Sequence, residues 1–544
     1  MNKNFIAVIL YITLFAYLYS FSEYGFNIWD EGSYAYGALR TYNGETPMED
    51  FNPRGYLPGR YYYGAFFFKL FGVHIQSLRL GTVVFTPAMI LMVYAVARKI
   101  MPPGFAFLSA LAMLSAPSMY YSRFYPFFCV LFMYLLIEFT QRKRAIWAFG
   151  LGISLMVGFF FKPEVALFSA LISGTVFAVM YFHGSQDTLL VTAENGPRLP
   201  RSFILGIALL FTGMGVALSV YAVNHGIPKK FFNLLWESYR VWGNPFPEVL
   251  PFFNILREIG WHRMFERLLF YLPGFVYLSV IANLIYRLNH TGWEKISLHL
   301  LIIVSFGICA FGLVVWRAGF DNLLRTLPPF YILFCYLLYL FWEKLSRWRA
   351  KDRSQPASGF SIRRITLNVM IVSLPFLFYY EMNFHQGFYA GSVGAIKQET
   401  APLRLNRLDV YTHPAEAKWL KQLVSRIQLH SLRGDPILAL PLNPIFYFLT
   451  DRVNPTLHDW ILPGMLDEDE QKKVVNQLRK NMPKLIIFAN IAIDGKEDRR
   501  FSRYAPIIFK FIAENYRQQE SIGFFQILFP KFIDKNPITN LEGF

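Results

Sequence analysis

The chain has 544 residues, of which 54% are hydrophobic and 18% aromatic, and its formal net charge is +17. Apolar content this high is typical of a protein that faces lipid. The basic residues fall in short clusters between long apolar runs, which indicates a membrane topology and argues against a nucleic-acid-binding protein.

Apolar runs of membrane-spanning length recur through the first two thirds of the chain. A bilayer core of about 30 Å needs about 20 apolar residues of helix. The sequence predicts eleven transmembrane helices, the first retained because no signal-peptide cleavage site follows it. They cover residues 5–21, 79–98, 104–119, 125–140, 146–161, 165–183, 203–223, 268–286, 298–316, 327–343 and 365–384.

The distribution of Lys and Arg predicts the orientation. With the N-terminus in the cytoplasm, the loops on that side carry most of the basic residues, and the segment 344–364 is the richest. The loops 22–78 and 224–267 are then on the outer face, together with the whole tail. We therefore expect a multi-pass protein of the inner (plasma) membrane.

Aromatic residues stand at helical spacing in the first of these loops. Two sets predict two short helices lying in the membrane interface. They are Tyr34, Ala35, Ala38 and Leu39, and then Tyr63, Phe66, Phe67 and Leu70.

The pattern changes after residue 384. Helices are predicted at 416–429, 469–481 and 506–516, and strands at 436–442, 484–493 and 523–529. Strands alternating with helices predict a small α/β domain. We therefore expect a membrane domain over residues 1–384 and an extracytoplasmic α/β domain over residues 385–544.

An acidic pair, Asp30 and Glu31, opens the first predicted loop helix. Asp30 could cap a helix that begins at Gly32, or it could act as a general base on a substrate hydroxyl. The sequence leaves both interpretations open. The pair could also hold a divalent metal ion, although one pair of carboxylates is weak support for a metal site.

Five cations are predicted at outer loops or at the outer ends of helices, against the positive-inside bias. Any one of them could simply extend toward the interface. Several converging on one face would instead bind an anion such as a phosphate. These residues are Arg54, Arg60, Lys162, Arg317 and Arg325. The aromatic run Tyr61, Tyr62 and Tyr63 is predicted to line the substrate cavity beside them.

These segments resemble a known superfamily. Residues 29–35, Trp-Asp-Glu-Gly-Ser-Tyr-Ala, resemble the Asp-Glu-x-x-Tyr-Ala motif in the first outer loop of GT-C glycosyltransferases that use polyprenyl-phosphate sugars. That group includes the lipid A aminoarabinose transferases and the protein O-mannosyltransferases. Residues 54–63 are similar to its Lys-Pro-Pro-Leu-x-Tyr-Trp segment, residues 161–163 to its Thr-Lys-Gly or Thr-Lys-Pro turn, and residues 325–328 to its Arg-Tyr-x-x-Pro motif.

The resemblance implies a GT-C fold and inverting transfer of a sugar from a polyprenyl-phosphate carrier to an extracytoplasmic lipid A, protein or polysaccharide acceptor. It implies that Asp30 is the general base and that Glu31 supports it or binds a metal. Arg54 or Arg60 would take the place of the loop lysine that grips the donor phosphate. Lys162 and Arg325 would assist.

Two features depart from the superfamily pattern. The loop lysine is absent, and the outer loop at residues 117–125 carries no carboxylate. No nucleotide-binding motif is present, so a cofactor other than a divalent metal is not predicted. A transporter or flippase of lipid-linked anions is the alternative function, and a membrane anchor that displays the tail is a third.

Overall fold

The computed structural model describes residues 3–52, 56–115, 120–183, 261–292, 294–316, 319–351, 373–374, 376–385 and 393–531. The predicted helix at 203–223 and most of the predicted outer loop at 224–267 lie outside the described residues. So do Arg54 and Arg317.

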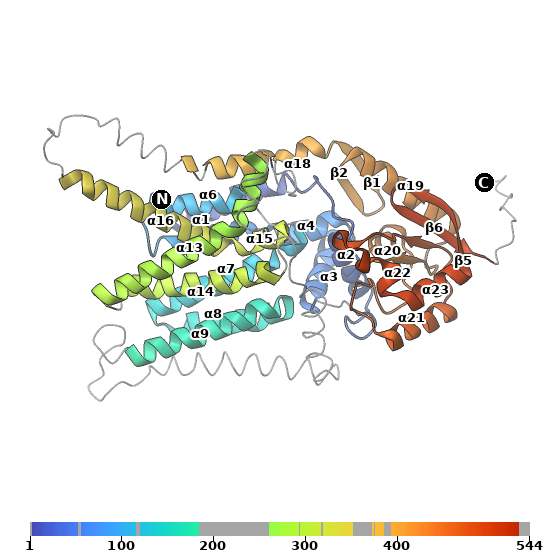
Figure 1. Cartoon of the computed structure of the whole chain (residues 1–544), viewed down its shortest axis with the longest axis horizontal. Helices are drawn as coiled ribbons and strands as arrows, with labels where there is room; N and C mark the ends of the chain where they lie inside the picture. The colour runs from blue at the N-terminus through green and yellow to red at the C-terminus, as the bar shows by residue number, and fades with distance from the viewer. Residues whose placement is uncertain are drawn as a thin grey trace. The chain divides into compact units, whose positions relative to one another are not determined.

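The described chain forms two compact units, which we call the helical unit and the α/β unit (Figure 1). The helical unit holds the described residues of Met1–Tyr24, Arg79–Phe231 and Trp242–Gln398. The α/β unit holds those of Gly25–Leu78 and Glu399–Phe544. The first predicted outer loop therefore belongs to the same unit as the tail, although a long run of helices separates them in sequence.

Helices make up nearly all of the helical unit. They are α1 (Lys3–Tyr19), α4 (Ile75–Val83, which spans the boundary between the units), α5 (Phe85–Ala97), α6 (Pro103–Ser115), η1 (Tyr120–Ser122), α7 (Phe124–Arg142), α8 (Ala145–Phe161), α9 (Pro163–His183), α13 (Trp261–Thr291), α14 (Lys295–Trp316), α15 (Phe320–Thr326), α16 (Pro328–Lys351), η2 (Glu381–His385) and α18 (Val393–Gln398).

Several of these helices could cross a membrane. Among the described residues, 5 helices are long and apolar enough, and the pair α15–α16, bent by 64°, would make a sixth. Three shorter apolar helices, within α1, α6 and α8, coincide with further predicted spans. The prediction of a polytopic helical protein is confirmed, while the total of eleven spans stays a prediction.

Close packing holds α7, α8, α9 and α14 together, and Figure 1 shows these helices running side by side. Gly158 on α8 is required where the helix meets α7, because a Cβ there would lie 2.5 Å from Phe132 and 3.0 Å from Phe128. Only glycine allows so close an approach of the two helices.

The α/β unit begins with α2 (Asp30–Tyr42) and α3 (Gly59–Phe71). Both predicted loop helices are thus present. However, α2 is buried along its length, so the expectation of an interfacial helix is wrong for it. By contrast, α3 exposes Tyr62, Phe66 and Leu70 along one face.

The tail supplies the rest of the α/β unit. Its elements are β1 (Ala401–Leu405), β2 (Leu408–Thr412), α19 (Pro414–His430), β3 (Leu438–Leu440), α20 (Ile445–Thr450), α21 (Glu468–Lys480), β4 (Ile486–Phe488), η3 (Ile493–Gly495), η4 (Glu497–Arg499), α22 (Phe501–Tyr504), α23 (Pro506–Asn515), β5 (Tyr516–Ile522) and β6 (Phe525–Pro530). β1 and β2 form an antiparallel hairpin, and a second sheet has the order β3-β4-β6-β5. Within that sheet β3 and β4 are parallel, and the other neighbouring pairs are antiparallel.

The predicted α/β character of the tail is confirmed. All three predicted helices and all three predicted strands correspond to α19, α21, α23, β3, β4 and β6. The hairpin β1–β2, the short helix α20 and the edge strand β5 were not predicted. Of these, α20 packs directly against α2 and so joins the tail to the first predicted outer loop.

Candidate functional site

The first turn of α2 carries the acidic pair. Asn27 caps this turn, because its Oδ1 accepts hydrogen bonds from the backbone N–H groups of Trp29 (3.0 Å) and Asp30 (2.8 Å). The interpretation of Asp30 as the cap of a helix beginning at Gly32 is therefore wrong, since α2 begins at Asp30. Because the Asp30 carboxylate does not cap α2, capping does not conflict with a chemical role for this residue.

The two carboxylates have different surroundings. Glu31 is buried, with 3% of its surface exposed, and its Oε2 lies 3.5 Å from the backbone nitrogen of Asn27. Asp30 is half-buried. A general base must reach the proton that it removes. The geometry therefore suits Asp30 for contact with a substrate and Glu31 for holding the turn.

Two glycines let α2 and α3 approach closely. A Cβ on Gly37 would lie 2.3 Å from the ring of Tyr61, and one on Gly64 would lie 2.7 Å from the Cβ of Ala38. This contact packs the first half of α3 against the middle of α2. It brings Arg60, the second residue of α3, against the ring of Tyr34 on α2.

Aromatic rings surround the guanidinium of Arg60. Its central carbon lies 4.1 Å from the ring centroid of Tyr56, 4.5 Å from that of Tyr34 and 5.6 Å from that of Tyr61. The negative faces of such rings attract a cation. Tyr34 follows Asp30 by about one turn of α2, so the guanidinium contacts the helix that carries the acidic pair.

One edge of this guanidinium is available to an anion. Arg60 is 3% exposed, and among the residues that the structure describes its Nε and Nη2 have no hydrogen-bond partner. These two nitrogens form the side of the guanidinium that grips an oxyanion with two parallel hydrogen bonds. A buried cation left in this state is costly unless a ligand completes its bonding.

The three consecutive tyrosines after Arg60 do not share a face. Tyr61 is 2% exposed and packs edge-on against Phe51. Tyr62 is 50% exposed, and Tyr63 packs against Phe67 with the two rings tilted by 43°. Successive residues on a helix point in directions about 100° apart. Tyr61 is therefore a packing residue of the α2–α3 contact, and only part of the predicted aromatic run can face any one cavity.

In the helical unit, Lys162 and Arg325 each have a nearby carboxylate. Lys162 follows α8, and its Nζ lies 3.8 Å from Glu164. Arg325 pairs with Asp321, one turn earlier on α15, and Asp321 also accepts a hydrogen bond from Tyr121 (3.3 Å). The sequence analysis did not single out Asp321, although its spacing from Arg325 is that of a helical ion pair.

Two further arginines lie at the same end of the helical unit. Arg79 and Arg123 are both buried, and their guanidinium carbons lie 4.7 Å and 4.4 Å from the ring centroid of Tyr120. The Nη1 of Arg79 also donates to the carbonyl oxygen of Ser22 (2.6 Å). Each of these arginines stands next to an apolar run in the sequence, and a basic residue in that position ordinarily indicates only the end of a helix. The sequence analysis therefore did not select either of them as a site residue.

The start of α7 connects these groups. Tyr125 is close enough to Glu164 and Arg325 to interact electrostatically with both. Arg325 also lies 5.9 Å from the ring of Tyr121, next to Tyr120. Arg123 and Arg325 thus lie near the start of α7, and Lys162 is linked to it through Glu164. That Lys162 and Arg325 bind one phosphate stays a prediction. How the α/β unit's Asp30 and Arg60 relate to them stays a prediction.

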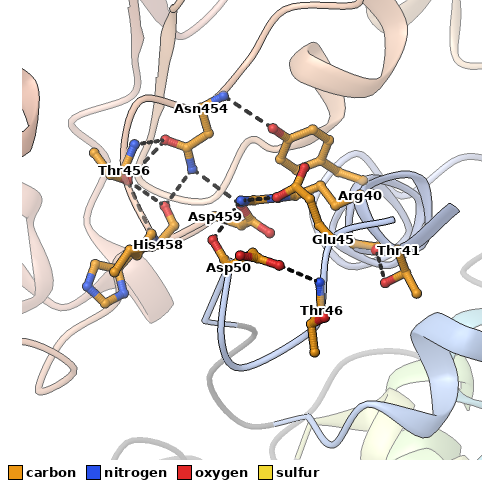
Figure 2. Close-up of polar contacts among 12 residues, drawn as sticks. Arg40, Thr41, Glu45, Thr46, Asp50, Asn454, Thr456, His458 and Asp459 are labelled. Atoms are coloured by element: carbon orange, nitrogen blue, oxygen red, sulfur yellow. Dashed lines mark hydrogen bonds and ion pairs between the residues drawn. The ribbon is translucent and has the colours of Figure 1, made fainter. Parts of the chain in front are cut away.

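Figure 2 shows side chains of the tail in contact with Arg40 of α2. Nη1 of Arg40 lies 2.8 Å from Oδ1 of Asp459, and both side chains are buried. Arg40 also pairs with Glu45 and donates to the carbonyl oxygen of Asp50 (2.9 Å). Burial alone would lower the pKa of Arg40, but Asp459 and Glu45 more than offset this and raise that pKa, so the guanidinium stays charged.

A metal site does not emerge from the described residues. They contain no group of three or more His, Cys, Asp or Glu side chains placed to hold an ion. Asp30 and Glu31 alone would leave most of the coordination shell of a divalent cation to water and substrate. No chemical step is therefore derived through a metal.

Comparison with known proteins gives the class. A model of the dolichyl-phosphate-mannose-protein mannosyltransferase family matches residues 55–192. The crystal structure of ArnT from Cupriavidus metallidurans, bound to undecaprenyl phosphate, is similar with a TM-score of 0.55 and 12% identity, over 96% of this chain and 97% of that one. No protein of curated function matches the chain in sequence.

The archaeal oligosaccharyltransferase AglB from Archaeoglobus fulgidus is similar as well. Its complex with an inhibitory peptide and a dolichol-phosphate matches with a TM-score of 0.53 and 12% identity, over 99% of this chain and 75% of that one. The crystal structure of its apo form matches with a TM-score of 0.53 and 12% identity, over 98% of this chain and 75% of that one.

The chain therefore has the GT-C fold, and its resemblance to the GT-C superfamily is confirmed. Within that superfamily, the sequence match is to the mannosyltransferase family over residues 55–192, and the structural match extends over nearly the whole chain.

Proposed function

We propose that this protein is a membrane glycosyltransferase that moves a sugar from a polyprenyl-phosphate carrier to an acceptor outside the cytoplasm. The acceptor class is lipid A or lipopolysaccharide, a protein, or a polysaccharide. The GT-C fold and the bound polyprenyl phosphates of ArnT and AglB support a lipid-linked donor. The observation that carries the proposal is the buried Arg60, whose Nε–Nη2 edge has no hydrogen-bond partner among the described residues and whose guanidinium contacts the ring of Tyr34, on the helix that begins with Asp30.

The reaction would be a single displacement with inversion. Asp30 takes the proton of the acceptor hydroxyl as its oxygen attacks the anomeric carbon of the sugar. The bond from that carbon to the phosphate oxygen breaks, and the polyprenyl phosphate leaves with the electron pair. Arg60 binds the phosphate through its Nε–Nη2 edge and stabilises the charge that develops on the leaving oxygen. Glu31 holds the turn that orients Asp30.

The other cations would assist with the phosphate. Lys162 and Arg325 are proposed as further donor-phosphate contacts, with Arg54 as the remaining candidate from the same loop as Arg60. The proposal places the site on the outer face of the inner (plasma) membrane, with the N-terminus in the cytoplasm. It follows from the positive-inside pattern of the loops.

The test uses the purified full chain in proteoliposomes with a mono-sugar polyprenyl phosphate labelled in the sugar. The proposal predicts labelled product on an acceptor extract of cell-envelope lipids, glycans and proteins, with release of unlabelled polyprenyl phosphate. Movement of intact labelled donor across the bilayer with no covalent product would support the transporter or flippase instead.

A further inference from the structure

A residue of the tail contacts the ring that holds Arg60. Trp460 is 1% exposed, and its ring stacks nearly parallel to that of Tyr56, with centroids 5.8 Å apart and planes at 9°. Tyr56 is in turn the ring closest to the guanidinium of Arg60, at 4.1 Å. A contact path therefore runs from the tail to Arg60 through one side chain.

The structure also shows what fixes the position of Trp460. Its neighbour Asp459 forms the buried ion pair with Arg40 on α2 (Figure 2). Asn454 reinforces this segment, because its Nδ2 donates to the carbonyl oxygen of His458 (2.8 Å) and its backbone nitrogen donates to the hydroxyl of Tyr36 (3.2 Å). The tail segment is thus anchored on the same helix that carries the acidic pair.

Tyr56 lies outside the helices and strands. It precedes α3, whose first residue is Gly59. The orientation of its ring therefore depends on the side chains that pack against it, and fixing that orientation costs conformational entropy. The stacked Trp460 ring offsets part of this cost by packing on Tyr56 in the orientation that faces Arg60.

We infer that Trp460 is a positioning residue for the donor phosphate: it orders Tyr56, which in turn holds the Arg60 guanidinium ready for the anion. This inference rests on the proposed role of Arg60 in binding the donor. It gives the tail domain a part in donor binding, whereas the sequence analysis offered only that a membrane anchor displays the tail.

The test measures binding of radiolabelled undecaprenyl phosphate, which carries no sugar, to the full chain in nanodiscs. Trp460→Ala should raise the dissociation constant roughly tenfold. This is roughly the loss of affinity expected when a desolvated cation–π contact is weakened. Trp460→Phe keeps a flat ring and should restore most of the affinity. Trp419→Ala is the matched control, since that tryptophan lies in the same unit but packs on Phe524 and Phe525.

A double-mutant cycle separates positioning from a general structural effect. In an Arg60→Gln background, Trp460→Ala should change the dissociation constant less than about twofold, because the group on which it acts is already gone. Equal losses in both backgrounds, or no loss in the single variant, would overturn the inference. If Arg60→Gln itself binds as tightly as the wild type, then the donor-binding role of Arg60 fails, and the inference fails with it.

Because Trp460 is buried, a second variant is used to distinguish a loss of positioning from misfolding. Tyr56→Leu keeps bulk but removes the aromatic face, and it should weaken binding as much as Trp460→Ala while leaving the thermal unfolding midpoint near that of the wild type. In transfer assays, both variants should raise the donor KM and lower kcat/KM for the donor, because Arg60 then holds the phosphate less well both before and during bond breaking. A fall in kcat at unchanged KM would contradict a role in positioning the phosphate.

Discussion

Arg40 and Asp459 form a buried ion pair, with Nη1 and Oδ1 2.8 Å apart, although the two residues are separated by 419 positions in the sequence. Arg40 belongs to the first predicted outer loop and Asp459 to the tail. The pair explains why these distant segments share one compact unit. It also places the tail against the helix whose first turn carries the candidate base.

Removing one partner of this pair should destabilise the α/β unit. Asp459→Ala leaves the Arg40 guanidinium buried without its main counter-charge, and we expect a loss of about 3–5 kcal/mol in the free energy of unfolding. Chemical denaturation in detergent micelles measures it. The matched control is Asp469→Ala, which breaks the exposed pair with Lys472 and should change nothing measurable. Equal effects of the two variants would show that the buried pair does not hold the unit together.

The α2–α3 contact should not tolerate a methyl group. In Gly64→Ala, the added Cβ would lie 2.7 Å from Ala38 and 3.0 Å from Leu78, so the helices must separate. We expect a loss of about 1–3 kcal/mol in stability and a larger loss of donor binding, since Arg60 moves with α3. Gly174→Ala on α9, where nothing lies within 4 Å of the added carbon, is the control and should retain stability. Unchanged donor binding in Gly64→Ala would refute the idea that this packing sets the position of Arg60.

Glu416 on α19 should give the tail a pH-dependent stability. Burial raises the pKa of this carboxyl, and a hydrogen bond from Thr412 only partly offsets the shift. A carboxyl with a raised pKa stabilises the fold fully below its unfolded-state pKa and loses that contribution as the pH rises through the folded-state value. Glu416→Gln should therefore be more stable than the wild type at neutral pH, with the difference shrinking toward about pH 4. Melting curves across this range test the prediction, and a difference that grows on acidification would contradict it.

The shape of the Arg60 side chain should matter as much as its charge. Arg60→Lys keeps the positive charge but loses the planar fork, so the donor KM should rise roughly tenfold. Arg60→Gln should do more, because the charge is lost as well. Steady-state transfer with varied donor concentration gives both values. A lysine variant with wild-type KM would show that the site needs only a point charge.

The sequence predicted regular elements well where the pattern was local. Amphipathic spacing found α19, α21 and α23, and buried apolar runs found β3, β4 and β6. β5 was missed because its residues, Tyr-Arg-Gln-Gln-Glu-Ser-Ile, are mostly polar, as an edge strand allows. The hairpin β1–β2 was missed because its two strands are only five residues long each, too short for a clear alternation of apolar and polar residues.

The candidate site could be predicted only in part. The pair Asp30 and Glu31 and the cation Arg60 were visible as motifs in one loop. Trp460 could not be found, because its stacking on Tyr56 depends on how the tail folds back on α2. A buried ion pair or ring contact between distant segments leaves no periodic signal in either one. Only the three-dimensional packing reveals such partners.

The central claim is that Asp30 is the base of a sugar transfer from a lipid phosphate. Its most direct test is single-turnover transfer of a labelled sugar from a polyprenyl-phosphate donor by the wild type and by Asp30→Asn, followed by mass spectrometry of the products. The exposed Glu23, replaced by Gln, is the control. We predict that Asp30→Asn binds the donor with wild-type affinity, keeps the wild-type melting temperature and transfers on the order of 10²–10⁴-fold more slowly. Transfer by Asp30→Asn at the wild-type rate would contradict the account.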